Sequence, residues 1–234
     1  MKNNKQYSEW SKRWSDVRSN VVNIDDNIDE VIKLWKTTPR GGWKRKTVVG
    51  GLGYRHHHKE GGGPRGEQRI EEQLFKKYLF TVEHNNSKCA FVPLYHKIPL
   101  ANQKPEQRIA DVFGLLLYNG AIHPLMVEVK EKADNCWYAL VENLQQVKMA
   151  RANPDFINSL LAKHKMPVTP AVWGMVLAPK DYFAENNKLT EAKKLLDALD
   201  KGTEKHCPID ARIAFAAYDK LRIHKINVIH SNWK

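Results

Sequence analysis

The sequence has few cysteines and no long apolar segment. Its three cysteines, Cys89, Cys136 and Cys207, are far apart and show no CxxC spacing. This argues against a disulfide framework or a structural zinc site, and it favours a reducing, cytoplasmic setting. No run of about 18 apolar residues is present, so no membrane span is predicted. The polar start, Met1 to Ser8, does not resemble a signal peptide.

Acidic residues are also scarce relative to basic ones. The chain has 26 Asp and Glu against 38 Lys and Arg, a formal net charge of +12. A protein this basic usually binds a polyanion, of which nucleic acid is the commonest and an anionic membrane surface the other. A basic surface that only aids solubility is the alternative. The glycines form no phosphate-binding P-loop, because no GK[ST] follows them.

The first 40 residues are predicted to form an N-terminal helical extension. Ile28, Val31, Ile32 and Trp35 recur at the spacing of one helix face. Acidic residues near the start of this pattern suit the helix dipole. We therefore separate residues 1–40 from the main domain that is predicted over residues 67–234.

Residues 41–66 between them are predicted to be a basic, glycine-rich loop. Trp43 and Tyr54 are interleaved with its basic residues, and such aromatics can stack on bases while basic groups neutralise phosphates. A plain solvated linker is the alternative. The adjacent histidines His56 to His58 lack the spacing of a preformed metal site and are interpreted as loop residues. The candidate nucleic-acid-binding residues in this loop and directly before it are Arg40, Lys44, Arg45, Lys46 and Arg55.

The remainder alternates between helical and strand patterns. The predicted elements are a helix over Glu67–Phe80, strands over Ala90–Leu100, Arg108–Tyr118 and Leu125–Glu131, a helix from Cys136 to about Ala152, a strand over Val172–Ala178, a helix over Thr190–Leu199, and strands around Ile213–Tyr218 and Ile223–Ile229. This order predicts an α/β fold in which helices flank a mixed central sheet.

An Asn-Gly pair between two of these strands predicts a tight hairpin. If Asn119-Gly120 is a two-residue turn, paired positions sum to 239, and Asp111 then lies directly opposite Glu128. Lys130, two residues beyond Glu128, projects from the same face. A proline at position 124 leaves a longer loop and a shifted register open.

Two opposed carboxylates in a buried sheet are destabilising unless something compensates them. A divalent cation resolves the conflict, because Mg²⁺ favours one or two carboxylates together with water and phosphate oxygens. The alternative is a buried ion-pair cluster formed with Lys130. Because buried charges are rare without a function, the pattern favours a metal site.

Asp111, followed after sixteen residues by Glu128-Val129-Lys130, resembles the PD-(D/E)XK nuclease superfamily. The resemblance covers about residues 67–180, and Ala110 stands where the first motif usually has proline. It implies an αβββαβ core of restriction-endonuclease or Holliday-junction-resolvase type. It also implies a Mg²⁺ site, with Mn²⁺ as a substitute, at Asp111, Glu128 and Val129, and a catalytic role for Lys130.

Two further positions fit this resemblance. Family members often carry a glutamate on the preceding helix, and Glu71 is favoured because it lies on an apolar stripe with Leu74, Phe75 and Tyr78, while Glu72 is the competing choice. Gln145 matches the glutamine of a Q-x-x-x-Y segment in which Met149 replaces the tyrosine, and an exposed helix residue is the alternative. Lys148 and Arg151 on the same helix are candidates for phosphate contact or for a solvated face.

The expected function is therefore Mg²⁺-dependent endonucleolytic cleavage of DNA. A restriction-like or mobile-element enzyme acting as a homodimer is favoured over a junction-resolving enzyme, and repair is a further setting for the same chemistry. An RNA-directed nuclease and a non-catalytic nucleic-acid-binding protein remain open alternatives.

Overall fold

The computed structural model describes residues 2–20, 22–37, 66–85, 87–100, 109–131, 135–184, 188–219, 223 and 225–234. Its elements are α1 (Lys2–Ser19), α2 (Ile24–Lys36), α3 (Glu67–Lys76), β1 (Phe80–His84), β2 (Ser87–Pro99), β3 (Ile109–Tyr118), β4 (Ala121–Val129), α4 (Cys136–Arg151), α5 (Pro154–Leu161), β5 (Trp173–Pro179), α6 (Lys180–Ala184), α7 (Leu189–Lys201), β6 (Ile213–Tyr218) and β7 (Lys225–Ser231). The strands and helices predicted from residue 90 onward agree with these elements to within a few residues at their ends, apart from α5 and α6, which were not predicted.

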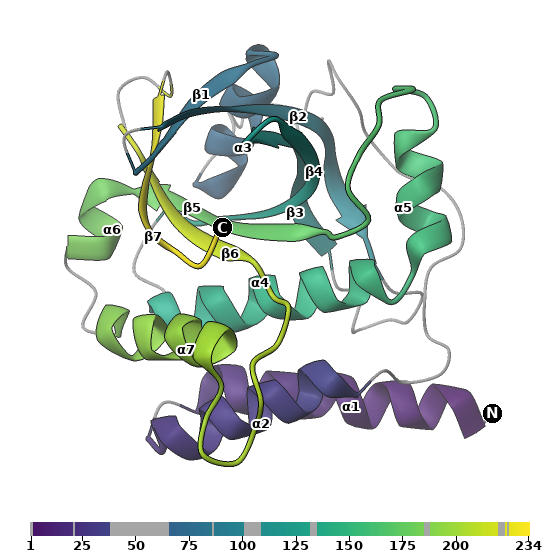
Figure 1. Cartoon of the computed structure of the whole chain (residues 1–234), viewed down its shortest axis with the longest axis vertical. Coiled ribbons are helices and arrows are strands. Elements are labelled where there is room, and N and C mark those ends of the chain that lie inside the picture. The colour runs from purple at the N-terminus through teal and green to yellow at the C-terminus, as the bar shows by residue number, and fades with distance from the viewer. Residues whose placement is uncertain are drawn as a thin grey trace, which may run out of the picture.

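The central sheet is a closed barrel, so the expectation of an open sheet flanked by helices was wrong. Its seven strands follow one another in sequence order, from β1 to β7 (Figure 1). Closure comes from β1, which pairs in parallel with β7 through Thr81–Lys225, Val82–Ile226 and Glu83–Asn227. The strand at Phe80–His84 was not predicted, and without it β7 would pair only with β6 and the sheet would not close.

The barrel separates two hydrophobic cores. The interior is filled by side chains such as Val112, Leu116 and Val127, as expected for a small barrel. Helix α3 packs against this interior core through Ile70 and Leu74. The predicted helix was too long at its C-terminal end, because α3 stops at Lys76 and leaves Tyr78 65% exposed.

Aromatic residues fill the end of the barrel where β3 ends and β5 begins. The Trp233 ring lies 5.6 Å from that of Trp173 and 6.0 Å from that of Tyr118, measured between centroids. The Trp233 and His84 ring centroids are 5.9 Å apart. This packing leaves the opposite rim, where β3 begins and β4 ends, as the place where polar side chains gather.

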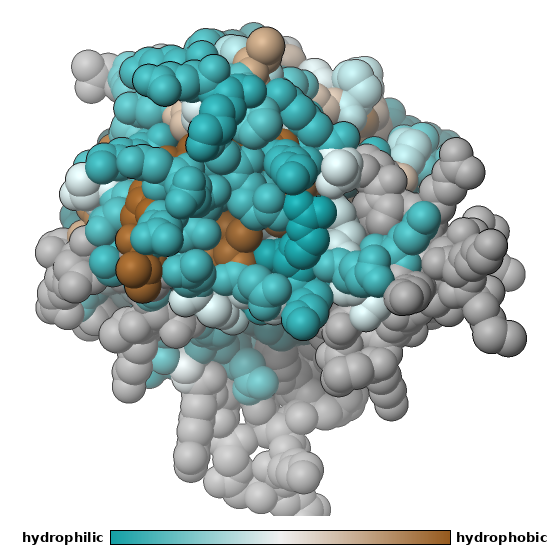
Figure 2. All heavy atoms as spheres, turned by 90° about the horizontal axis from the view of Figure 1, so that it is seen from below, coloured by the Kyte–Doolittle hydropathy of each residue, from teal (hydrophilic) through white to brown (hydrophobic). Residues whose placement is uncertain are grey.

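A helical layer covers one side of the barrel. Helices α4 and α7 lie side by side next to the barrel, and α1 and α2 lie beyond them (Figure 1). Trp137 of α4 is fully buried, and its Nε1 donates to the carbonyl of Val17, 3.0 Å away. The outer face of the helical layer is predominantly hydrophilic (Figure 2). Among the described helices, none is long and apolar enough to cross a membrane.

The predicted β3–β4 hairpin is confirmed. Asn119 and Gly120 have positive φ angles of 49° and 76°, as a two-residue hairpin turn requires. The ladder runs from Tyr118–Ala121 to Val112–Val127, so every pair sums to 239. The proline at position 124 causes no slip, because β5 begins to pair with β4 only at Leu125.

A bulge in β2 shifts the register beside this hairpin. Pro93 pairs with Gly114, whereas Tyr95 pairs with Phe113, so one residue of β2 is left over. Beyond the bulge His96 pairs with Val112 and position 98 with position 110. Lys97 therefore stands opposite residue 111.

Candidate active site at the barrel rim

Three adjacent strands bring one row of ionisable side chains to the rim. Continuation of the hairpin register places Asp111 opposite Glu128, and the register of β2 places Lys97 opposite Asp111. Asp111 and Glu128 are 7% and 4% exposed, so both carboxylates are withdrawn from bulk water. The row on β2, β3 and β4 is lysine, aspartate, glutamate.

The Lys97 ammonium bridges two carboxylates. Its Nζ lies 2.9 Å from Oδ1 of Asp111 and 2.6 Å from Oε1 of Glu71 on α3. The second oxygen of Asp111 accepts the backbone N–H of Val129 at 2.9 Å. The second oxygen of Glu71 contacts Nε2 of His96. Lys97 has a φ of +49°, a conformation that costs a side-chain-bearing residue energy and is typical of functional sites.

Glu128 faces a second group of partners, which come from the end of β4 and from α4. Its Oε1 lies 2.7 Å from Nζ of Lys130, and its Oε2 accepts from Nε2 of Gln146 at 2.5 Å. The Lys130 ammonium also lies 3.2 Å from Oε2 of Glu142 and 3.9 Å from Oε1 of Glu67. Lys130 is 5% exposed, so these carboxylates are its immediate electrostatic environment.

Burial dominates the acid–base properties of the opposed carboxylates. Burial raises the pKa of the Asp111 carboxyl, and the attraction of Lys97 opposes this rise without cancelling it. Burial raises the pKa of Glu128 well above its ordinary value, and the negative charges of Asp111 and Glu142 add to the rise. The two groups therefore resist carrying full negative charge side by side, as the hairpin register predicts.

The neighbouring groups are held in their charged forms. Burial would raise the pKa of Glu71, but the hydrogen bonds and charges of His96 and Lys97 outweigh it and lower that pKa. Burial would lower the pKa of Lys130, but Glu128 and Glu142 outweigh it and raise that pKa. The site thus combines ammonium groups with carboxylates of unequal proton affinity.

The carboxylate pair of Glu71 and Asp111 fits a divalent cation. Their oxygens already converge on a single positive charge, the Lys97 ammonium. Mg²⁺ requires only one or two carboxylates with water and substrate oxygens, which this pair can supply. Among the described residues no group of three or more His, Cys, Asp or Glu is arranged as a metal site. Glu71 and Asp111 are the residues that could hold a hydrated Mg²⁺ or Mn²⁺.

The structure brings most of the predicted site residues together. Asp111, Glu128, Lys130 and Glu71 lie in the two connected groups, and Val129 contributes its backbone N–H. Of the two candidate glutamates, Glu71 is fully buried and reaches Lys97. Glu72 is only half-buried.

The other predicted positions do not join these two groups. Gln145 is buried, and its Nε2 has no hydrogen-bond partner among the described residues. Lys148 and Arg151 lie over the Trp35 ring of α2, at 5.8 and 5.4 Å from its centroid. Arg151 also donates to the carbonyl of Val172 at 2.9 Å. Residues 38–65, which include Arg40, Lys44, Arg45, Lys46 and Arg55, lie outside the described part of the chain.

Sequence reasoning missed Glu142 and Gln146. Both contact the site from α4, and they are four residues apart, on one face of the helix. Helix α4 is buried almost all round, so a glutamate and a glutamine on a shared face were a detectable signal. The motif resemblance directed attention to Gln145 instead, one residue and about 100° around the helix from Gln146.

If the chain cleaves DNA as the sequence resemblance implies, replacement of Gln146 by alanine is expected to reduce cleavage about tenfold, because such supporting contacts orient the groups they hold. Gln146 donates to Glu128, whereas Gln145 touches neither Glu128 nor Lys130 by any described hydrogen bond. Gln145→Ala is the matched control and should retain most activity. Rate constants for plasmid cleavage compare the two, and equal losses would contradict the assignment.

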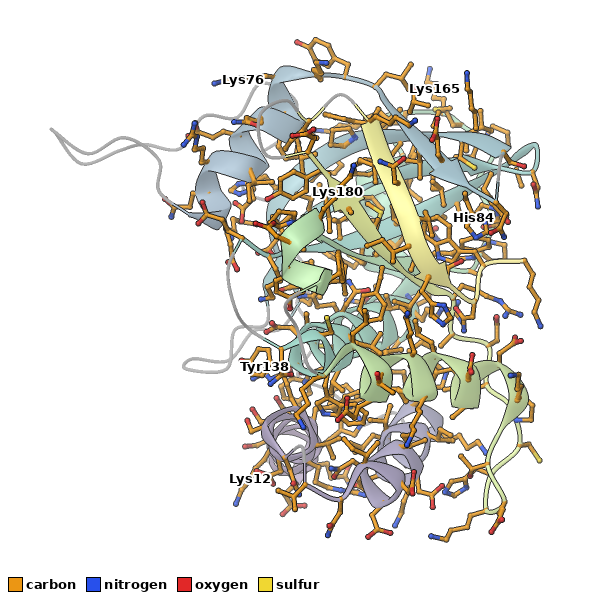
Figure 3. All side chains as sticks on the ribbon, turned by 90° about the vertical axis from the view of Figure 1, so that its left-hand side faces the viewer. Lys12, Lys76, His84, Tyr138, Lys165 and Lys180 are labelled. Atoms are coloured by element: carbon orange, nitrogen blue, oxygen red, sulfur yellow. The ribbon has the colours of Figure 1, made fainter. Side chains whose placement is uncertain are left out.

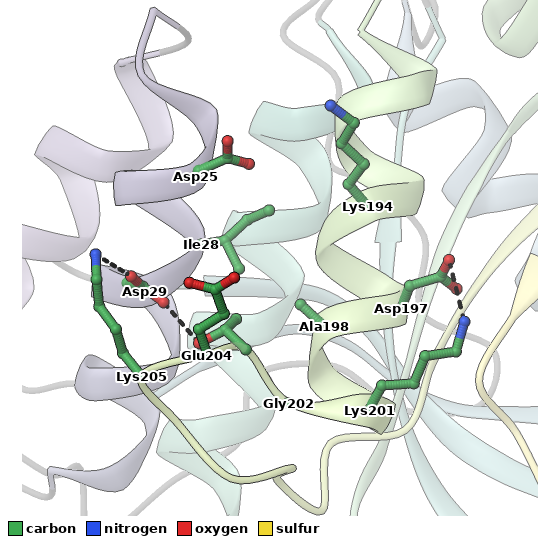
Figure 4. A pocket seen from close by; sticks show the side chains of 11 residues that line it. Asp25, Ile28, Asp29, Lys194, Asp197, Ala198, Lys201, Gly202, Glu204 and Lys205 are labelled. Carbon is green, nitrogen blue, oxygen red and sulfur yellow. Dashed lines mark hydrogen bonds and ion pairs between the residues drawn. The ribbon is translucent and has the colours of Figure 1, made fainter.

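A separate cleft of about 510 Å³ lies between α2, α7 and the segment after α7 (Figure 4). Its charged side chains pair mainly with one another: Asp29 with Lys205 at 2.8 Å, and Asp197 with Lys201 at 3.7 Å. None of its lining residues belongs to the rim site. The buried ionisable groups at the rim, rather than this cleft, define the candidate active site.

No protein family, curated protein or solved structure matches this chain.

Proposed function

We propose that the chain is a metal-dependent endonuclease that hydrolyses DNA phosphodiester bonds, with Mg²⁺ as cofactor and Mn²⁺ as a substitute. The observation that carries the proposal is the buried rim site, in which Asp111 and Glu128 oppose each other and Lys130 contacts Glu128. Buried ionisable groups with perturbed pKa values are concentrated at functional sites. The sequence resemblance to the PD-(D/E)XK nucleases supports the same chemistry.

The side chains can divide the work of hydrolysis between them. When bound, Mg²⁺ supplies Lewis acidity and lowers the pKa of a coordinated water. Asp111 and Glu71 would hold it, because their oxygens converge on one cationic position. Glu128, which accepts a hydrogen bond from Gln146, would orient the attacking water by hydrogen bonding. The Lys130 ammonium would stabilise negative charge that develops on the phosphate.

The proposed substrate is double-stranded DNA. The formal net charge of +12 supports a polyanionic partner. A restriction-like or mobile-element enzyme would act as a homodimer to cut both strands, and a repair enzyme would use the same site. The absence of CxxC spacing and the lack of disulfides among its cysteines support a cytoplasmic location. Branched DNA and RNA are the competing substrates and need side-by-side comparison.

The proposal is tested with supercoiled plasmid in Mg²⁺ or in EDTA. We expect nicking or linearisation by wild type in Mg²⁺ alone, and loss of cleavage in Asp111→Asn. Asp197→Asn is the control, because Asp197 is an exposed aspartate of α7 paired with Lys201. Cleavage that persists in EDTA or in Asp111→Asn would show that the rim site does not catalyse the reaction.

One observation favours a non-catalytic alternative. The Glu128 oxygens contact Lys130 and Gln146, and the Asp111 oxygens contact Lys97 and Val129, so the cluster is internally neutralised. A nucleic-acid-binding protein with a structural ion-pair network would show this feature. Such a protein would bind DNA in EDTA as well as in Mg²⁺. It would cleave no plasmid, branched DNA or RNA.

A further inference from the structure

The N-terminal helix α1 reaches the candidate active site through one arginine. Arg18 is 7% exposed, and its Nη1 lies 2.7 Å from Oε1 of Glu142. The other oxygen of Glu142 lies 3.2 Å from Nζ of Lys130. A continuous chain of charges therefore runs from α1 through α4 to the rim of the barrel.

Additional contacts fix the guanidinium of Arg18 in place. Its Cζ lies 4.6 Å from the ring centroid of Tyr138, which stands at the start of α4, between the barrel and the N-terminal helices (Figure 3). Its Nη2 donates to Oγ of Ser15 at 3.2 Å. The preceding residue, Val17, accepts the hydrogen bond from Trp137. Arg18 is thus held against α4 rather than extended into solvent.

The charge of Glu142 decides how strongly Lys130 is drawn away from Glu128. Lys130 lies between these two carboxylates, at 2.7 Å from Glu128 and 3.2 Å from Glu142. Arg18 partly neutralises the negative charge of Glu142, and this weakens the electrostatic attraction between Glu142 and the Lys130 ammonium. Without Arg18, Glu142 would be a partly buried carboxylate with Lys130 as its only described cationic partner, and the ammonium would shift toward it.

We infer that Arg18 is a positioning residue for Lys130, and that α1 is therefore part of the catalytic unit. This inference rests on the proposed nuclease function, in which Lys130 stabilises charge on the phosphate. Arg18 acts through Glu142, and neither of them is assigned contact with substrate. The helical extension thus has a role in the rate of the reaction rather than in substrate capture.

The kinetic test compares Arg18→Met, Arg18→Lys, Glu142→Gln and the double variant Arg18→Met/Glu142→Gln. Arg18→Met should lower the single-turnover rate of plasmid cleavage about tenfold, in the range typical of residues that orient a catalytic group. DNA affinity should stay within about twofold, because Arg18 touches α1 and α4 rather than a surface assigned to DNA. Arg18→Lys should restore part of the rate, because it keeps the positive charge but not the planar geometry.

The double variant separates positioning from structural support. In the double variant residue 142 is a neutral glutamine, so it carries no negative charge for Arg18 to neutralise and does not attract the Lys130 ammonium. Arg18→Met/Glu142→Gln should therefore cleave faster than Arg18→Met alone. A purely structural role predicts that the second change adds to the loss. Arg13→Met is the control, because Arg13 lies on the same helix and pairs with Glu30 of α2 through Nε at 2.8 Å. An Arg18→Met rate within twofold of wild type, or a double variant slower than Arg18→Met, would overturn the inference.

A second measurement does not depend on cleavage. Urea unfolding of Arg18→Met, Lys130→Met and their combination gives the coupling between two residues that both contact Glu142 and both lie over the Tyr138 ring, 4.6 and 5.9 Å from its centroid. We expect a coupling of about fivefold in the unfolding constant that falls sharply in the Glu142→Gln background, because Tyr138 is still present there and Glu142 is not. If wild type cleaves nothing but this coupling is found, the proposed function fails and the link from Arg18 to Lys130 stands. Absence of the coupling overturns the link itself.

Discussion

Replacement of Glu128 by glutamine is expected to abolish Mg²⁺-dependent cleavage and at the same time to raise the thermal stability of the protein at pH 8. The loss of activity should be about 1,000-fold, because the Glu128 carboxylate is proposed to orient the attacking water, and a positioned acid–base group contributes about 100- to 10,000-fold. The gain in stability follows from the cost of ionising a carboxyl buried next to Asp111 and Glu142. Glutamine keeps the size of the side chain and removes that cost.

The sign of the pH dependence follows from the direction of the pKa shift. The pKa of Glu128 in the folded protein lies well above the ordinary value of 4.5, so the folded state holds the proton to higher pH than the unfolded state does. The contribution of this group to stability is therefore complete below pH 4.5 and is lost as pH rises through the folded-state pKa. The advantage of Glu128→Gln over wild type should be larger at pH 8 than at pH 5.

Thermal unfolding at both pH values and plasmid cleavage at pH 8 check the two effects together. For a chain of this length each kcal/mol corresponds to about 2–4 °C in melting temperature. Glu83→Gln is the matched control, because Glu83 is a partly exposed β1 residue that pairs with Lys225 at 2.5 Å. It should leave activity intact and change stability by less than about 0.5 kcal/mol. A Glu128→Gln protein less stable than wild type at pH 8 would mean that the ion pair with Lys130 outweighs the cost of burial.

The hairpin and its opposed carboxylates were accessible from sequence because their determinants are local. The turn needs positive φ at two successive residues, and Asn119-Gly120 supplies both. Once the turn is fixed, the period of a strand determines which residues oppose each other. The position of Asp111 opposite Glu128 follows from counting residues back from the turn, and the structure has that register.

Barrel closure was not accessible, because it depends on a contact between distant segments. Strand β1 has only five residues and pairs with β7, more than 140 residues later in the chain. No local pattern in either strand predicts which strand it pairs with, and the same apolar alternation is found in open sheets and in barrels. The four strands of the predicted αβββαβ core are present as β2, β3, β4 and β5, but β1 lies between α3 and β2, and β1, β6 and β7 continue the sheet and close it.

The residues that contact Asp111, Glu128 and Lys130 were harder to predict than the hairpin, because their positions depend on more than local sequence. The sequence did not place Lys97 in the site, because its position opposite Asp111 depends on the one-residue bulge between Pro93 and Tyr95. Without that extra residue His96 would stand opposite Asp111. Arg18 contacts Glu142 from 124 residues away, and nothing in the sequence relates the two positions. Long-range packing, rather than local propensity, supplies these members of the site.

Replacement of Gly114 by alanine is expected to give the largest loss of stability among single methyl additions to the barrel. A Cβ at Gly114 would meet the backbone carbonyl of Val92, and it would lie 2.6 Å from Cε2 of Phe91 and 3.1 Å from Cα of Pro93. Backbone atoms of a closed barrel cannot move aside as the end of a flexible side chain can. We expect a loss of about 3 kcal/mol, the upper end of the usual overpacking cost, and a melting temperature lower by about 6–12 °C.

The same substitution should reach the active site through the bulge. Gly114 pairs with Pro93 at the point where the β2 register shifts, and that shift places Lys97 opposite Asp111. Gly120→Ala is the matched control: its φ of +76° makes alanine cost about 1–2 kcal/mol, but a Cβ there meets nothing within 4 Å. Both variants should be less stable, yet only Gly114→Ala should also lose cleavage at a temperature where both remain folded. Equal specific activity of the two folded variants would show that the bulge can adjust without moving Lys97.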